Sequence, residues 1–342
     1  MNNAYSITSY GYLSGGEEVH KIILNNTQGA EAEIITYGGT LTRLMCQDRH
    51  GNWDNIVLGL TSLEEYVANS AFLGALIGRY GNRIANAQYQ QDGELIRLEH
   101  NEGNNILHGG AKGFDKVVWD FEPFANDSGV GVILTHTSPD GDMGFPGNLA
   151  VEAIYELKND NSLELRFKAT TDKSTVISLT HHPYFNLTGN GSILNHQLMV
   201  NADHITPAND QMIPTGELLP VADTPFDFRS SKAIGQDIEE NHQQLTFGSG
   251  YDHNYVLNKD HNESLVAIAS DPESGRQLEI HSSEPGVQFY SGNHLDEQRT
   301  GFCLEPQHFP DSPNKPQFPS TVLNPGEVFT SFIIYQVGLT ND

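Results

Sequence analysis

Hydrophobic and polar residues alternate with a period of two along much of this chain. In residues 149–158 every odd position is apolar, whereas the even positions include Glu152, Glu156 and Lys158. The turn-forming residues Asn159-Asp160-Asn161 follow, and the alternation resumes over 163–170. Because neighbouring side chains of a strand point to opposite faces, this pattern predicts a β-hairpin with one apolar and one charged face.

The same alternation at 130–136, 278–281 and 328–337 predicts further strands. Helix signals are few. Ser62-Leu63-Glu64-Glu65 has the form of a capping box and predicts a short helix over 62–69, with Leu63, Tyr66 and Val67 on one face. Many short strands with few helices are typical of a β-sandwich or barrel. No shift in composition divides the chain, so we expect one domain spanning 1–342.

The charge balance restricts the classes of partner. Eighteen Lys and Arg against 44 Asp and Glu give a formal net charge of −26, which disfavours nucleic acid and anionic membrane surfaces. The longest nearly apolar run, 71–78, is far shorter than the roughly 20 residues of a membrane span. The first residues have no signal-peptide pattern, so we expect a cytoplasmic protein. Cys46 and Cys303 are far apart in sequence and are expected to be reduced, structural thiols.

Several catalytic signatures are missing from the sequence. It has no P-loop, no dinucleotide fingerprint and no Gly-x-Ser-x-Gly nucleophile elbow. Among 15 histidines the only close pair is His181-His182, and adjacent residues of a strand cannot chelate one ion together. A metal site assembled from distant loops is the alternative. We expect neither a metal nor an organic cofactor.

Four segments place polar residues in unusual surroundings. They are 78–84, with two of nine arginines; 104–110, with His108 between Asn and Gly pairs; 178–187, with the paired histidines; and 301–310, where Glu305 ends an apolar run. A weaker fifth is 251–255. Each alone also fits a solvated turn or a buried structural residue. Together they supply a carboxylate, imidazole, amide and guanidinium donors and aromatic surface but no nucleophile, a set that suits proton transfer on a neutral, hydroxyl-rich substrate.

The chain closely resembles the aldose 1-epimerase family, also known as galactose mutarotases, in six motifs that occur in the family's order from about residue 30 onward. These are Gly-Arg-Tyr-Gly-Asn-Arg-Ile (78–84), Asn-Ile-Leu-His-Gly-Gly (105–110), His-Pro-Tyr-Phe-Asn-Leu (182–187), Tyr-Asp-His-Asn-Tyr (251–255), Pro-Gly-Val-Gln-Phe-Tyr-Ser-Gly-Asn (285–293) and Phe-Cys-Leu-Glu-Pro-Gln (302–307). The resemblance implies an all-β fold, a large antiparallel β-sandwich of the galactose-mutarotase type with few short helices. It also implies cofactor-free interconversion of the α and β anomers of free hexoses such as D-galactose and D-glucose.

The resemblance assigns roles to individual residues. It implies that Glu305 is the general base on the C1 hydroxyl and His182 the general acid on the ring oxygen. At ordinary pKa values Glu305 would be ionised near pH 7 and His182 could carry the second proton. The residues that the resemblance assigns to sugar binding are Asn82, Arg83, His108, Tyr184, Asp252 and Gln288.

Two residues of these motifs are assigned no part in the chemistry. Arg79 also matches the family motif, but we interpret it as structural. His181 stands where the family usually has Asn. Because alternation turns His181 away from His182, we expect little effect on the chemistry.

Three other functions fit part of the pattern. A phosphorylated-hexose epimerase on the same fold would need a Lys and Arg cluster for the phosphate, and the sequence has none evident. A non-catalytic carbohydrate-binding protein would not need both Glu305 and His182. A glycoside hydrolase would use a pair of carboxylates. The expected partner is a small monosaccharide; the sequence sets neither the preferred aldose nor the oligomeric state.

Overall fold

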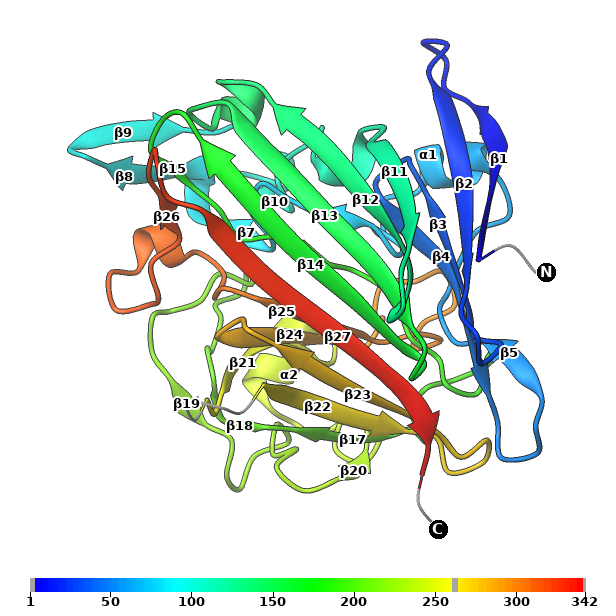
Figure 1. Cartoon of the computed structure of the whole chain (residues 1–342). Helices are drawn as coiled ribbons and strands as arrows, with labels where there is room; N and C mark the ends of the chain where they lie inside the picture. The colour runs from blue at the N-terminus through cyan, green and yellow to red at the C-terminus, as the bar shows by residue number, and fades with distance from the viewer. Residues whose placement is uncertain (1–3, 260–263, 341–342) are drawn as a thin grey trace.

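Nine strands form the largest sheet of the computed structural model, which describes residues 4–259 and 264–340 (Figure 1). In order across the sheet they are β11 (Asp120–Ala125), β12 (Gly129–Ser138), β13 (Leu149–Lys158), β14 (Ser162–Thr171), β27 (Phe329–Leu339), β23 (Arg276–Ser282), β22 (Leu265–Ser270), β17 (Gln197–Val200) and β20 (Lys232–Ala233). The late strand β27 lies between β14 and β23, so it joins two groups of strands that are distant in sequence.

The predicted hairpin is confirmed as β13 and β14. Tyr155 pairs with Leu165 and Leu157 with Leu163, and all four side chains are buried on the same face. Asn161 adopts a left-handed backbone (φ 67°) in the turn, as Asn readily does. The alternation at 130–136, 278–281 and 328–337 corresponds to β12, β23 and β27. Period two was a reliable signal here because one face of this sheet is packed and the other is not.

Two five-stranded sheets complete the main β-structure. One contains β1 (Tyr5–Tyr12), β2 (Glu18–Asn25), β3 (Glu31–Ile35), β4 (Thr40–Gln47) and β5 (Trp53–Asn55) in that order. The other contains, in order, β19 (Leu219–Pro220), β18 (Ala202–Ile205), β21 (Asp252–Leu257), β24 (Gly286–Tyr290) and β25 (Cys303–Gln307). Four short pairs are β6 (Leu76–Ile77) with β16 (Thr180–His181), β7 (Arg83–Ile84) with β10 (Ile106–Leu107), β8 (Gln88–Gln91) with β9 (Glu94–Arg97), and β15 (Thr175–Val176) with β26 (Val322–Leu323).

Helices are short in the described residues. Besides the 3-10 turns η1 (Ala85–Ala87), η2 (Phe114–Lys116), η3 (Asp142–Gly144) and η4 (Ser312–Asn314), the structure has α1 (Leu63–Ala68) and α2 (Gln243–Gly248). The Ser62 capping box of α1 is confirmed. Leu63 and Tyr66 are buried, whereas Val67, on the same predicted face, is 46% exposed. The sequence analysis missed α2. None of the described helices is both long enough and apolar enough to span a membrane.

The sheet that ends in β25 separates the main core from a second set of side chains. Phe289 on β24 and Leu304 on β25 belong to the large apolar cluster formed with the nine-stranded sheet. Because side chains alternate along a strand, Cys303 and Glu305 lie on the other face of β25 from Leu304. That face carries the candidate site. The architecture confirms the all-β fold of several antiparallel sheets with few short helices.

Candidate active site

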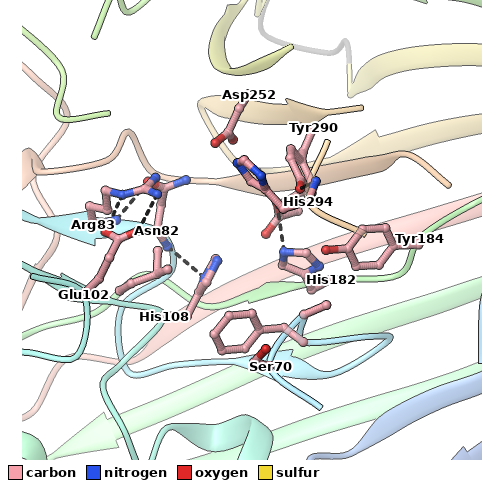
Figure 2. Close-up of a pocket in the computed structure, with 14 residues that line it drawn as sticks. Ser70, Asn82, Arg83, Glu102, His108, His182, Tyr184, Asp252, Tyr290 and His294 are labelled. Atoms are coloured by element: carbon pink, nitrogen blue, oxygen red, sulfur yellow. Dashed lines mark hydrogen bonds and ion pairs between the residues drawn. The ribbon is translucent and has the colours of Figure 1, made fainter. Parts of the chain in front are cut away.

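A cavity of about 230 Å³ lies over this face of the sheet (Figure 2). It is below the roughly 300–1,000 Å³ of pockets for drug-sized ligands, so its scale is that of one small molecule. The residues that line it are Ser70, Ala71, Phe72, Asn82, Arg83, Glu102, Leu107, His108, His182, Tyr184, Asp252, Tyr290, His294 and Glu305.

Strand register brings the acidic side of the cavity together. Glu305 on β25 pairs with Gln288 on β24, and the next row joins Asp252 on β21, Tyr290 and Cys303. Residues directly opposite in an antiparallel sheet share a face, so these side chains form one surface. Gln288 is buried and is not among the lining residues; its Nε2 donates to Asp252 Oδ1 at 2.7 Å. Gln288 therefore lies beside Glu305 on this face and holds Asp252 by a hydrogen bond.

The two adjacent histidines point to different environments. His182 is held by backbone hydrogen bonds to Gly74 and Ala75, and its Nε2 lies 3.6 Å from Glu305 Oε1. His181 turns away from the cavity, as expected, but it is not on the surface. Its ring is fully buried, with Nδ1 2.9 Å from the Tyr335 hydroxyl and Nε2 3.1 Å from the Gly74 carbonyl oxygen. Since a carbonyl only accepts, Nε2 carries the hydrogen.

The segments 78–84 and 104–110 meet through short backbone contacts. Arg83 pairs with Leu107, and His108 N–H donates to the Asn82 carbonyl at 3.0 Å. Gly109 has φ +84°, and a Cβ there would lie 1.8 Å from the Gly78 carbonyl oxygen, so glycine permits the close approach of these two segments.

Arg79 is structural, as interpreted. It is buried and donates to Ser138 Oγ and to the carbonyls of Ser138, Pro139 and Pro146. Its guanidinium group therefore ties the 78–84 segment to the loop after β12, with its donors occupied by protein acceptors rather than directed at the cavity.

Arg83 does face the cavity, but in a fixed ion pair. Its Nε and NH2 each lie 2.7 Å from one carboxylate oxygen of Glu102, a bidentate arrangement (Figure 2). Burial opposes the charge on Arg83, yet the hydrogen bonds to Glu102 leave its pKa raised. The guanidinium is thus held in one orientation at the wall of the cavity.

Aromatic rings cover one side of the cavity. Phe72 packs 4.6 Å from the ring of His108 and 5.8 Å from that of His182, and Tyr184 lies 5.1 Å from His182. Tyr290 packs edge-on against Tyr184. Flat apolar surface beside convergent hydrogen-bonding groups suits the C–H face of a sugar ring.

Burial shifts the pKa values of the cavity carboxyls upward. Desolvation raises the pKa of Glu305 well above its ordinary value, the charge of Asp252 adds to the shift, and Arg83 opposes it. Burial likewise raises the pKa of Asp252, against Arg83 and the hydrogen bond from Gln288. The expectation that Glu305 has an ordinary pKa is therefore wrong.

The imidazoles shift in the opposite direction. Burial lowers the pKa of His182 to about 4 and that of His108 well below its ordinary value. Burial thus favours the neutral form of both groups, so between its two macroscopic pKa values the pair holds one titratable proton, on Glu305.

His108, His182 and Glu305 also have the composition of a metal site, with one potential ligand atom from each within 4.8 Å of the others. One contact argues against metal binding. The Asn82 backbone N–H donates to His108 Nδ1 at 3.2 Å, and a neutral imidazole with an acceptor at Nδ1 carries its hydrogen on Nε2. In this tautomer His108 has no free lone pair to offer a metal ion.

The cavity contains most of the residues that the sequence singled out. Seven of the eight candidates line it, and Gln288 supports it through its hydrogen bond to Asp252. The sequence analysis missed Ser70, Ala71, Phe72, Glu102, Leu107, Tyr290 and His294 as lining residues. Leu107 and Tyr290 lay inside quoted motifs and could have been found. Nothing in the sequence separates Glu102 from the other acidic residues.

Comparison with known protein families gives a match to the aldose 1-epimerase model over residues 20–336. The chain is 38% identical to galactose mutarotase of Sus scrofa over 339 residues, which covers 95% of this chain and 96% of that protein. It is 37% identical to aldose 1-epimerase of Escherichia coli K12 over 335 residues, which covers 94% and 96%.

Solved structures agree with these relatives. A galactose 1-epimerase from Lactobacillus acidophilus NCFM superposes with a TM-score of 0.89 at 31% identity, covering 98% of this chain and 99% of that one. Family and architecture therefore coincide over almost the whole length.

Proposed function

Since the chain belongs to the aldose 1-epimerase family, we propose that it interconverts the α and β anomers of free hexoses, D-galactose and D-glucose, by acid–base ring opening and closure. The chain is an enzyme of the isomerase class. The observation that carries the detailed proposal is the pair of His182 and Glu305, 3.6 Å apart in a cavity of sugar size.

A cyclic aldose is a hemiacetal, and ring opening requires two proton movements. In the proposed reaction Glu305 removes the proton of the C1 hydroxyl while His182 protonates the ring oxygen, so that the C1–O5 bond breaks and an aldehyde forms. Rotation about C1–C2 and the reverse proton transfers close the ring with the other configuration. No electrons leave the substrate, and the enzyme regains its proton distribution after each turnover.

The proton count of the pair is compatible with this mechanism. The pair holds one titratable proton between the two groups, and burial favours its position on Glu305. A sugar hydroxyl beside the carboxylate supplies a hydrogen bond that favours its ionised form, and the proton then belongs to His182. Each positioned proton transfer typically contributes about 10²–10⁴ in rate.

The remaining cavity groups fit a neutral polyol. Arg83, His108 and Asn82 offer donors or amide groups, Asp252 offers an acceptor, and Tyr184 offers a ring face. Arg83 is the only Lys or Arg among the lining residues, and Glu102 occupies two of its N–H groups. The described lining residues therefore offer no cluster of cations for the phosphate of a phosphorylated hexose, so free sugars are the better substrates.

Polarimetry of freshly dissolved α-D-galactose and α-D-glucose tests the proposal. Wild type should speed the decay of optical rotation, EDTA should leave the rate unchanged, and Glu305→Gln should lose at least about 100-fold in kcat. Faster turnover of the 6-phosphates than of the free sugars would favour the phosphosugar alternative. Sugar binding without acceleration would favour a binding protein.

The paired histidines supply a matched control. His182→Asn should lose kcat on the same scale as Glu305→Gln. His181→Asn should keep most of kcat but lower the melting temperature, because it breaks buried hydrogen bonds to Tyr335 and Gly74. Inactivation by His181→Asn in a folded protein would reverse the assignment of the acid.

We also propose that residues 1–342 act as one catalytic domain in the cytoplasm. The position of β27 between β14 and β23 supports one unit, since it ties both halves of the large sheet together. Cys46 and Cys303 are both free and buried, which fits a reducing compartment.

A further inference from the structure

We propose that Glu102 is a positioning residue: its carboxylate holds the guanidinium group of Arg83 in the orientation in which Arg83 contacts the sugar. This inference rests on the proposed function, since the contact between Arg83 and a sugar is part of that proposal. Glu102 lies outside the six sequence motifs, and the sequence assigned it no role.

The hydrogen bonds between the two side chains have only one possible direction. Arg83 donates through Nε and NH2, and each donor lies 2.7 Å from its own carboxylate oxygen of Glu102 (Figure 2). A guanidinium group has N–H donors and no acceptor, and two parallel bonds to one carboxylate fix both its position and its plane. Glu102 leaves the N–H groups of NH1 unused.

The backbone around Glu102 is itself anchored to the strand pair that carries Arg83. Glu102 N–H donates to the Asn105 carbonyl at 3.1 Å, and Asn105 N–H donates back to the Glu102 carbonyl at 2.8 Å. The side chain of Asn101 bonds both the N–H and the carbonyl oxygen of Leu107. Leu107 pairs with Arg83 in the ladder of β7 and β10. The carboxylate of Glu102 therefore approaches Arg83 from a turn that is fixed relative to β7.

Positioning of Arg83 matters because another carboxyl group of the cavity attracts it. The charge of Asp252 favours the charged form of Arg83. Burial raises the pKa of Asp252, and Arg83 opposes this shift. Without Glu102 we expect the guanidinium group to turn toward Asp252, so that two groups assigned to the sugar would pair with each other. Glu102 therefore keeps both groups available to the substrate.

Loss of the ion pair should weaken sugar binding more than it slows the chemistry. In Glu102→Ala we expect KM for galactose to rise about 5-fold, the scale of ordering one long side chain on binding. The value of kcat should change less than about twofold, because Glu305 and His182 still act on the reacting atoms. Glu102→Gln should behave like Glu102→Ala, since an uncharged amide offers one oxygen in place of two. Wild-type KM in Glu102→Gln would overturn the role of the carboxylate.

A double-mutant cycle with Arg83 distinguishes positioning from direct contact with the sugar. If Glu102 acts through Arg83, Glu102→Ala should change kcat/KM less than about twofold once Arg83 is already replaced by alanine. If the losses of the two single variants multiply in full, Glu102 contacts the sugar by itself and the proposal is wrong.

The ion pair of Arg229 and Asp227 is the matched control. Arg229 Nε and NH2 lie 2.9 and 2.7 Å from the two carboxylate oxygens of Asp227, and neither residue lines the cavity. Asp227→Ala should leave KM and kcat unchanged. An equal rise of KM in Asp227→Ala and Glu102→Ala would assign the effect to general destabilisation and overturn the proposal.

Equilibrium binding separates this proposal from the proposed function. In an NMR titration, which requires no turnover, galactose should bind Glu102→Ala about 5-fold more weakly than wild type. If wild type binds galactose without accelerating mutarotation, the proposed function fails, and the ratio of the two dissociation constants still tests Glu102. Equal dissociation constants for wild type and Glu102→Ala would refute the positioning role.

Discussion

At the scale of single residues, burial reverses the ordinary order of the two pKa values. An exposed glutamate loses its proton before a histidine does, but in this cavity Glu305 is shifted up and His182 down to about 4. Below the lower of the two macroscopic pKa values the pair holds two protons and lacks a base. Above the higher value it holds none and lacks an acid.

This order predicts the pH dependence of kcat/KM. The acid limb of the profile should lie near pH 4, where His182 becomes protonated in the free enzyme. The alkaline limit belongs to Glu305, whose pKa burial raises, so activity should persist above the pH at which an ordinary glutamate loses its proton. Polarimetric rates as a function of pH, corrected for the uncatalysed reaction, measure the profile. An acid limb centred near pH 6.5, the ordinary pKa of histidine, would contradict the lowered pKa of His182.

At the scale of elements, a short turn holds a carboxyl group in a buried position. The turn η2 carries Asp115, which is buried, and its Oδ1 has no hydrogen-bond partner. Burial raises the pKa of Asp115 to about 6, partly offset by Lys116. A carboxyl whose pKa is higher folded than unfolded binds more protons in the folded state, so it lowers stability as pH rises from about 4 to about 6.

Replacement of this carboxyl should therefore stabilise the fold at neutral pH. Asp115→Asn is expected to increase the free energy of unfolding by about 2–3 kcal/mol at pH 7.5, since each pKa unit corresponds to about 1.4 kcal/mol. The gain should shrink toward pH 4, where both states are increasingly protonated. Urea unfolding at the two pH values measures this difference, with the exposed Asp210→Asn as the control. An equal gain at both pH values would show that packing, not ionisation, is responsible.

At the scale of the whole molecule, the net charge of −26 opposes the compact state by self-repulsion. Ion pairs such as Arg43 with Glu31 and Lys158 with Glu164 relieve this only locally, because Lys and Arg are less than half as many as the acidic residues. Exposed ion pairs also contribute little each, about 0–1 kcal/mol. The repulsion among unpaired carboxylates is therefore the larger electrostatic effect.

Salt should stabilise this protein. Raising NaCl from about 0.01 to about 0.3 M shortens the Debye length from about 30 Å to well below 10 Å, which screens the repulsion between distant carboxylates. We expect the melting temperature to rise by several degrees, and KCl should act alike because screening depends on ionic strength. A fall in melting temperature with salt would mean that the surface ion pairs outweigh the repulsion.

The sequence by itself determined the local features of this protein. Period-two alternation identified β13 and β14 because one face of that hairpin is buried, and the capping box located α1 because its hydrogen bonds span only three residues. The order of the six motifs was sufficient to identify the family. These signals depend on residues close together in the chain, so they can be recognised from the sequence alone.

Only the tertiary structure decided how those local pieces act together. Strand pairing and loop contact bring Glu102 to Arg83, and sheet packing brings His182 to Glu305 over a separation of more than 120 residues. Val67 is exposed and His181 is buried. In both cases burial depends on which elements pack against the helix or strand, and the local pattern does not show this. The shifted pKa values follow from this enclosure, because desolvation is a property of the surroundings and not of the residue.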